Sequence, residues 1–257
     1  MVIRKMRDHV ITSNWLAVGI DLIIVVIGVF LGIQASNWNT ARNEGAEARV
    51  VRSRLIQDLR ANEAVLAGRQ VYYRQVRQHA LRALEGFTSR QADLGEQFLV
   101  DAYQSTQVNL RPVRRYLYDE LVAAGKLASI GDLAVQQEAA EYYLGLEAID
   151  DLNSHMPPYR DRLRRQIPYP VEERIRALCS DDARLDRGAL VITLPTSCDI
   201  NLNSAVITQA VAQLRAAREM DLDLARYLID LDQKLSMYKN AERRAHLLQR
   251  SLENQDS

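Results

Sequence analysis

The sequence predicts an all-α protein in which a single N-terminal transmembrane helix continues into an elongated helical bundle with one disulfide-closed loop. Three observations predict this class. Residues 15–38 form one uninterrupted apolar segment of membrane length. Beyond them, apolar residues recur at helical spacing through two long stretches. The chain also has just two cysteines, Cys179 and Cys198, in a segment without helical periodicity.

The membrane segment runs from Trp15 to Trp38. As a helix it is roughly 35 Å long, enough to cross a hydrocarbon core of about 30 Å and leave both indoles at the headgroup level. We therefore predict that Trp15 and Trp38 are interfacial anchors. A cleavable signal peptide is the competing interpretation, because Arg4, Lys5 and Arg7 precede the segment. We favour a retained anchor, since the apolar run exceeds an ordinary signal core and no clean small-x-small cleavage site follows it.

Asp21 is the only ionisable residue inside this segment. An ionised carboxylate at the bilayer centre costs about 3 kcal/mol on insertion scales, so Asp21 is expected to face protein. On a helix it shares one stripe with Gly28, Gly32 and Ser36, and such spacing of small residues lets two helix backbones approach closely in lipid. The sequence therefore predicts a helix–helix interface along this stripe, formed with a second copy of the chain or with another membrane protein.

The flanking charges predict the orientation of the segment. Basic residues precede it, whereas residues 39–48 carry only Arg42 among Lys and Arg. Because Lys and Arg are enriched on the cytoplasmic side, we expect residues 1–14 to form a cytoplasmic stub and residues 39–257 an extracytoplasmic domain. The expected location is the bacterial inner membrane, with this domain in the periplasm.

The two cysteines fit an oxidising compartment. Cys179 and Cys198 are expected to pair and to close a ring of about 20 residues, which the loop-entropy relation values at about 3 kcal/mol. Two free thiols in the cytosol are the alternative. Within the loop 179–198, residues 189–194 alone read as strand, and we expect an isolated extended piece and no sheet.

The domain itself is predicted to be mainly helical. A long helix at about 46–87 can continue directly from the span because no proline intervenes, and its apolar stripe is broken only at Asn62 and Arg69. A second long helix is predicted at about 204–252, after the cap formed by Asn203 and Ser204. Neither can bury its stripe alone, so we expect the two to pack together.

Shorter helices are predicted at about 93–166. One is expected to start at Pro112, which suits the first turn of a helix, and to end before Gly125. Asp132 is expected to cap the next one. Pro157 and Pro158 then end or kink that helix, because proline cannot continue the hydrogen-bonding pattern.

Two groups of short motifs stand out, one in the anchor and one in the middle of the chain. They are Asp21, Val26-Ile27-Gly28, Gln34 and Trp38-Asn39 in the anchor, and Tyr118, Leu121, Gly125-Lys126-Leu127, Ile130 and Tyr142-Tyr143 beyond it. In these motifs the chain resembles a family of uncharacterised bacterial single-pass membrane proteins. Family members often have glutamate where this chain has Asp21, and residues 150–200 carry no resemblance. The resemblance implies fold and membrane location, and no activity comes with it.

Little in the sequence indicates chemistry. The 33 basic and 33 acidic residues balance, which gives no basic field for nucleic acid. The four histidines are scattered, the cysteines form no CxxC motif, and no nucleophile elbow or phosphate-binding glycine loop occurs, so we predict no catalytic residue, no metal and no cofactor. The acids around Asp181 and Asp182 lack the glycine and glutamate of a calcium loop.

Two main classes of function agree with these observations. The first is a non-enzymatic, membrane-anchored scaffold or interaction protein, an accessory subunit of an envelope complex. The second is a transport or energising subunit in which Asp21 carries protons or ions, with a multi-span partner. A ligand-sensing helical bundle is a weaker third class.

Overall fold

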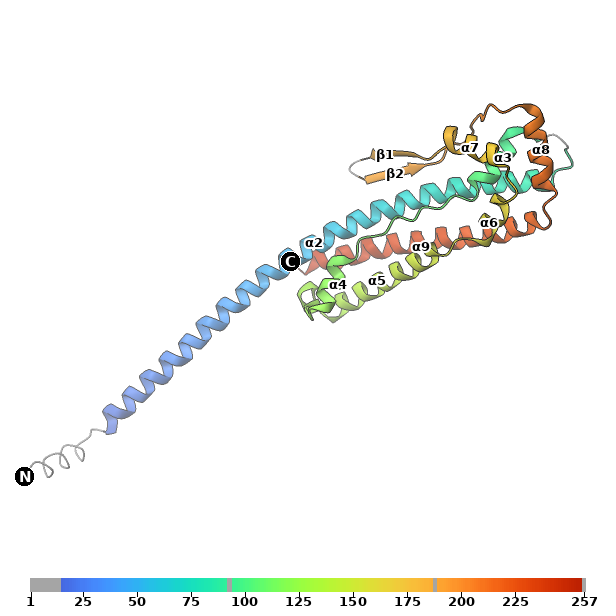
Figure 1. Cartoon of the computed structure of the whole chain (residues 1–257). Coiled ribbons are helices and arrows are strands. Elements are labelled where there is room, and N and C mark those ends of the chain that lie inside the picture. Colours follow the sequence, from blue (N-terminus) through green and yellow to red (C-terminus); the bar gives the residue numbers. More distant parts are fainter. Residues whose placement is uncertain (1–14, 92–93, 187–188, 256–257) are drawn as a thin grey trace, which may run out of the picture. The chain divides into compact units, whose positions relative to one another are not determined.

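The structure is a computed structural model that describes residues 15–91, 94–186 and 189–255. Its elements in chain order are α2 (Trp15–Thr88), α3 (Gly95–Gln104), α4 (Tyr116–Ala123), the short 3₁₀ helix η1 (Leu127–Ile130), α5 (Leu133–Ser154), α6 (Pro158–Arg164), α7 (Tyr169–Leu178), strands β1 (Asp182–Asp186) and β2 (Ala189–Thr193), α8 (Ser204–Arg215) and α9 (Met220–Asn254) (Figure 1). The chain divides into two compact units, one up to Val51 and one from Arg52 onward. The predicted helical class is confirmed.

Helix α2 confirms that the predicted span and the first long helix are one element. It runs without interruption from Trp15 to Thr88, and no proline lies between these residues. In the second unit, α2, α5 and α9 lie side by side as a three-helix bundle (Figure 1). The bundle buries leucines of all three helices, each worth about 1.5–3 kcal/mol; they include Leu55, Leu59, Leu66, Leu146, Leu231 and Leu248.

The two long helices pack antiparallel. Arg60 of α2 contacts Glu253 of α9 at 3.3 Å, and Arg77 contacts Asp232 at 2.6 Å, so residue numbers rise along one helix as they fall along the other. Between these pairs the rings of Tyr73 and Tyr238 stack with centroids 5.7 Å apart. The predicted packing of the long helices is therefore confirmed.

Helix α5 also runs antiparallel to α9. Glu141 in its first half contacts Arg244 at 3.2 Å, and Asn153 near its end accepts a 2.8 Å hydrogen bond from the Tyr238 hydroxyl. The predicted cap at Asp132 is confirmed, because its carboxylate accepts a hydrogen bond from the backbone N–H of Val135 at 3.0 Å. Asn203 caps α8 in the same way.

The second long helix predicted at about 204–252 is two helices. Helix α8 ends at Arg215 and α9 begins at Met220, and Glu219 between them has a left-handed backbone (φ 58°). The break has a packing reason: α8 lies against α3, whereas α9 lies against α5 and α6. A single straight helix could not follow both surfaces.

The helix predicted to start at Pro112 starts later, at Tyr116. Residues 112–115 are not helical, because the side chain of Asn62 in α2 forms hydrogen bonds with the backbone of Arg114. A tertiary contact thus overrides the local preference of proline for a first helical turn.

The predicted isolated strand at 189–194 is instead half of a hairpin. β2 pairs antiparallel with β1, with Asp182 opposite Thr193 and Asp186 opposite Ala189. β1 alternates polar and apolar residues only through Ala183 and Leu185, and both are exposed, Leu185 by 76%. Backbone hydrogen bonds therefore form this hairpin without a buried face, and a five-residue segment with three charged residues and no β-branched or aromatic residue gives only a weak strand signal.

Candidate functional site

The first candidate surface is the apolar part of α2. Residues 20–44 are exposed throughout, including a continuous set of large aliphatic side chains such as Leu22, Ile24 and Leu31 at 60% or more. Exposure of so many apolar side chains is unfavourable in water and favourable in lipid. Among the described residues, this helix alone is long and apolar enough to cross a membrane.

The predicted stripe lies on this exposed helix. Asp21, Gly28, Gly32 and Ser36 are all exposed, and an added Cβ atom at either glycine would meet nothing within 4 Å. Seven, four and four residues separate them in turn, which places them along one face of a helix. The stripe is therefore open along its length for another helix. No residue described in the chain occupies it.

Of the two predicted interfacial tryptophans, Trp38 has a side chain within the described part of the structure. Trp38 is 68% exposed, and the guanidinium of Arg42 lies 5.9 Å from the centre of its ring. A tryptophan beside an arginine suits the boundary between apolar and charged surroundings. Trp15 is the first residue of α2, and its side chain lies outside the described part of the structure. Residues 1–14, the predicted stub, also lie outside it.

Cys179 and Cys198 form the predicted disulfide, with Cα atoms 5.8 Å apart. Polar contacts attach the ring to the bundle as well. Gln104 of α3 donates a 2.6 Å hydrogen bond to the carbonyl of Cys179, and Gln75 of α2 both donates to and accepts from the backbone of Leu194. The disulfide and these hydrogen bonds hold a segment that has no helical stripe of its own.

A buried polar cluster fastens the same region. His79 of α2 and Asp101 of α3 are 1% and 3% exposed, and the His79 Nδ1 lies 2.6 Å from the Asp101 carboxylate. Arg82 donates to that carboxylate at 2.7 Å and to the carbonyl of Thr196 at 3.1 Å, while the other ring nitrogen of His79 contacts the carbonyl of Pro195. The cluster therefore joins α2, α3 and the segment after β2.

These charges change the acidity of Asp101. Burial, the largest influence, raises the pKa of its carboxyl, but hydrogen bonds from His79 and Arg82 and the charge of Arg82 together bring that pKa below its ordinary value. The cluster is a structural joint, because Oδ1 of the carboxylate and both nitrogens of the imidazole contact protein groups.

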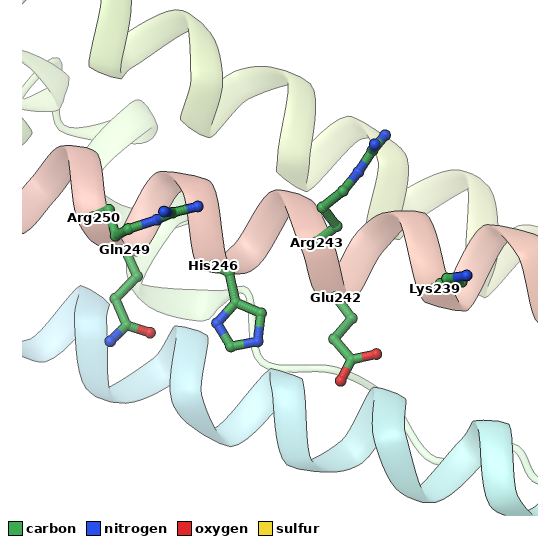
Figure 2. A pocket seen from close by; sticks show the side chains of 6 residues that line it. All are labelled: Lys239, Glu242, Arg243, His246, Gln249 and Arg250. Carbon is green, nitrogen blue, oxygen red and sulfur yellow. The ribbon is translucent and has the colours of Figure 1, made fainter.

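The second candidate surface is the outer face of α9 (Figure 2). Lys239, Arg243, His246 and Arg250 recur along one side of the helix and line a shallow groove of about 620 Å³, together with Glu242 and Gln249. Glu242, His246 and Gln249 point towards α2, and Arg243 points towards α5. Glu242 accepts a 2.6 Å hydrogen bond from Gln70, and His246 contacts Glu63 at 3.1 Å.

Three cations on this face have no such partner. Within the described part of the chain, Lys239, Arg243 and Arg250 form no ion pair. The sequence reasoning did not single them out, although their spacing of four and seven residues on a predicted helix is a usable signal. The groove is open and its lining is mostly basic, so it is suited to an acidic surface and offers no enclosed pocket for a small substrate.

Further charged groups lie inside the bundle. Lys234 of α9 is 7% exposed, and its ammonium lies 4.7 Å from the centre of the Tyr73 ring. Burial first, and then the nearby charge of Arg69, lowers the pKa of Lys234 to about 8. Arg69 is 1% exposed, and its one ion-pair partner within the described residues is Asp150 at 3.6 Å. Both cations contact tyrosine rings, which offset part of their desolvation.

Among the described residues, no three or more His, Cys, Asp and Glu side chains are grouped so that they could hold a metal ion. No family model, curated protein or solved structure matches the chain.

Proposed function

We propose that the chain is a single-pass protein of the bacterial inner membrane that presents its helical domain on the extracytoplasmic side as a non-enzymatic scaffold. The observation that carries the proposal is helix α2, in which an exposed apolar segment of membrane length and one wall of the bundle belong to the same uninterrupted helix. The same helix therefore supplies both the membrane anchor and part of the core of the domain that the anchor carries.

Three further observations support this proposal. The basic residues before the span favour a cytoplasmic N-terminus. The Cys179–Cys198 disulfide suits an oxidising compartment outside the cytoplasm. The buried charged groups of the bundle contact one another, aromatic rings or backbone, and the groove on α9 is an open surface, which suits binding to another protein better than turnover of a small molecule.

Asp21 favours one alternative, a transport or energising subunit. It is an exposed carboxylate on the apolar helix, and an acid inside a membrane is often part of a proton or ion path. That function needs a partner with several spans, which would shield the carboxylate from lipid.

The substitution Asp21→Asn separates these two functions, since asparagine can hydrogen-bond across helices but cannot take up and release a proton. The full chain and the Asp21→Asn variant would be purified from membranes in mild detergent, and the proteins that accompany each would be identified. A scaffold is expected to keep the same partners and the same cellular phenotype in both. Retention of the partners with complete loss of the phenotype would contradict the scaffold and support the ion-carrying alternative.

A further inference from the structure

We propose that the outer face shared by α5 and α9 binds a second copy of itself, so that two anchored chains associate through their helical domains. We call this the α5–α9 face; it is formed by Glu138, Glu141 and Leu144 of α5 and by Arg243, Leu247 and Arg250 of α9. The inference rests on the proposed function in one respect only, namely that both copies are inserted in the same membrane with the same orientation.

The centre of the α5–α9 face is apolar. Leu144 is 68% exposed and Leu247 is 48% exposed, although both lie on helices whose opposite sides are fully buried. Between the helices runs a groove of about 260 Å³, lined by Glu138, Glu141, Arg243, Arg244, Leu247 and Leu248. Large aliphatic side chains exposed beside a groove and surrounded by charges are typical of a protein–protein interface.

The charges on the two helices are complementary. The α9 side carries Arg243 and Arg250, which form no ion pair within the described residues. The α5 side carries Glu138, exposed and likewise without an ion pair there, and Glu141, which is 69% exposed although Arg244 contacts it at 3.2 Å. One face therefore offers a basic row and an acidic row in parallel. A surface of this kind matches a rotated copy of itself, and no other partner is needed to supply the opposite charges.

The levels of these residues along the helices also match. Because α5 and α9 are antiparallel and Glu141 contacts Arg244, Arg243 lies at the level of Glu141, and Leu247 lies at the level of Glu138. A two-fold axis parallel to the helices leaves every level unchanged and places α9 of one copy opposite α5 of the other. Arg243 then faces Glu141 of the second copy, and Arg250 lies within about one helical turn of Glu138 of the second copy. Leu247 lies near the axis, opposite Leu247 of the second copy.

A symmetry axis in this direction keeps the helices of the two domains parallel, so equivalent residues of the two copies lie at the same level. The arrangement is an isologous contact of four helices, α5 and α9 from each copy, and it closes as a dimer without leading to filaments.

A cysteine at the axis tests this arrangement in the full chain. The two native cysteines are bonded to each other, so in Leu247→Cys the new thiol is the only free one. Membranes that contain this variant would be treated with a short bismaleimide and analysed by denaturing electrophoresis. A covalent dimer is expected. The matched control is Leu81→Cys, a leucine of α2 that is 37% exposed and lies outside the α5–α9 face, and it is expected to give little dimer.

Charge reversal distinguishes a specific interface from proximity imposed by the anchors. Arg250→Glu added to Leu247→Cys is expected to lower the cross-linking yield several-fold, and further addition of Glu138→Arg is expected to restore it. Neither reversal removes an ion pair within the described part of the chain. Equal yields for Leu247→Cys and Leu81→Cys, indifference to charge reversal, or a cross-link to a protein of a different mass would each overturn the inference. None of these results would change membrane insertion or the side of the membrane on which the domain lies, so failure here is distinct from failure of the proposed function.

Discussion

Asn62 and Arg114 are joined by two hydrogen bonds between a side chain and a backbone. The Asn62 amide donates to the carbonyl of Arg114 at 2.8 Å, and the backbone N–H of Arg114 donates to the Asn62 side-chain oxygen at 2.7 Å. Asn62 is completely buried. The amide of Asn62 thus forms hydrogen bonds with both backbone groups of Arg114, in the segment before α4. Asn62 occupies a position of the apolar stripe of α2 at which an apolar residue is expected.

We therefore expect Asn62→Leu to destabilise the domain, although it completes the apolar stripe of α2. Leucine would remove the partner of both the N–H and the carbonyl of Arg114, and the loss of these two part-buried hydrogen bonds costs roughly 1–3 kcal/mol. Urea unfolding of the full chain in detergent, followed by the near-ultraviolet circular dichroism of its tyrosines, measures this. Asn240→Leu, at an exposed position of α9, is the control and is expected to change the free energy of unfolding by less than about 0.5 kcal/mol. Equal stability of the two variants would show that the hydrogen-bonded pair contributes nothing.

Asp101 is expected to make the stability of the domain depend on pH in acid. Its pKa is lower in the folded chain than the ordinary value of 3.8, so the folded state binds the proton more weakly than the unfolded state does. The stabilisation is complete above about pH 4 and is lost as the pH falls through the folded pKa. Asp101→Asn should therefore be less stable than the wild type at pH 7, and the difference should shrink below about pH 4. A difference that is the same at both pH values would contradict the role assigned to the carboxylate charge.

Lys234 is expected to make the stability of the domain depend on pH in the alkaline range, because burial disfavours its charged form. Its pKa falls to about 8 in the folded chain from an ordinary value of 10.5, so folding disfavours the charged ammonium. Stability should rise with pH between about 8 and 10, because the unfolded chain keeps its proton there and the folded chain does not. Lys234→Met should abolish this rise. Lys239 is an exposed lysine of the same helix, so Lys239→Met should retain the rise. The same urea experiment at pH 7.5 and pH 9.5 compares the two variants. The higher value is still below about pH 10, where tyrosines ionise.

The stripe of the anchor gives a prediction about association in the membrane. Gly28→Ile and Gly32→Ile add branched side chains at positions where two backbones would have to meet, so they should weaken self-association or partner binding without preventing insertion. The matched control is Ile24→Val on the same exposed helix. Oligomer and partner content would be compared in membranes and in detergent. Isoleucine variants that associate as the wild type does would show that this stripe faces lipid alone.

The helices of this protein could be predicted from the sequence because their signals are local. Apolar stripes indicated α2 and most of α9, and Asp132 and Asn203 marked the starts of α5 and α8 with side chains that accept hydrogen bonds from the first turn. The disulfide could be predicted from the cysteine count and the expected compartment. These features depend on residues within a few positions of one another or on a single pair.

The differences arise where distant segments decide the local structure. The late start of α4 depends on Asn62, and the break before Met220 depends on which helices α8 and α9 contact, with no glycine or proline to mark it. β1 is a polar, exposed segment that forms a strand because β2 lies beside it. Helical periodicity places Arg69, His79 and Lys234 on a buried face but names none of their partners, so the polar joints of the bundle could not be predicted from spacing alone.

The side of the membrane on which the bundle lies is the central claim, and paired reporter fusions at the C-terminus of the full chain test it most directly. One reporter is active only outside the cytoplasm and the other only within it. We expect activity from the first and silence from the second, together with Cys179 and Cys198 that resist alkylation in freshly isolated membranes until they are reduced. Activity of the cytoplasmic reporter alone, with both cysteines freely alkylated, would contradict the orientation proposed here.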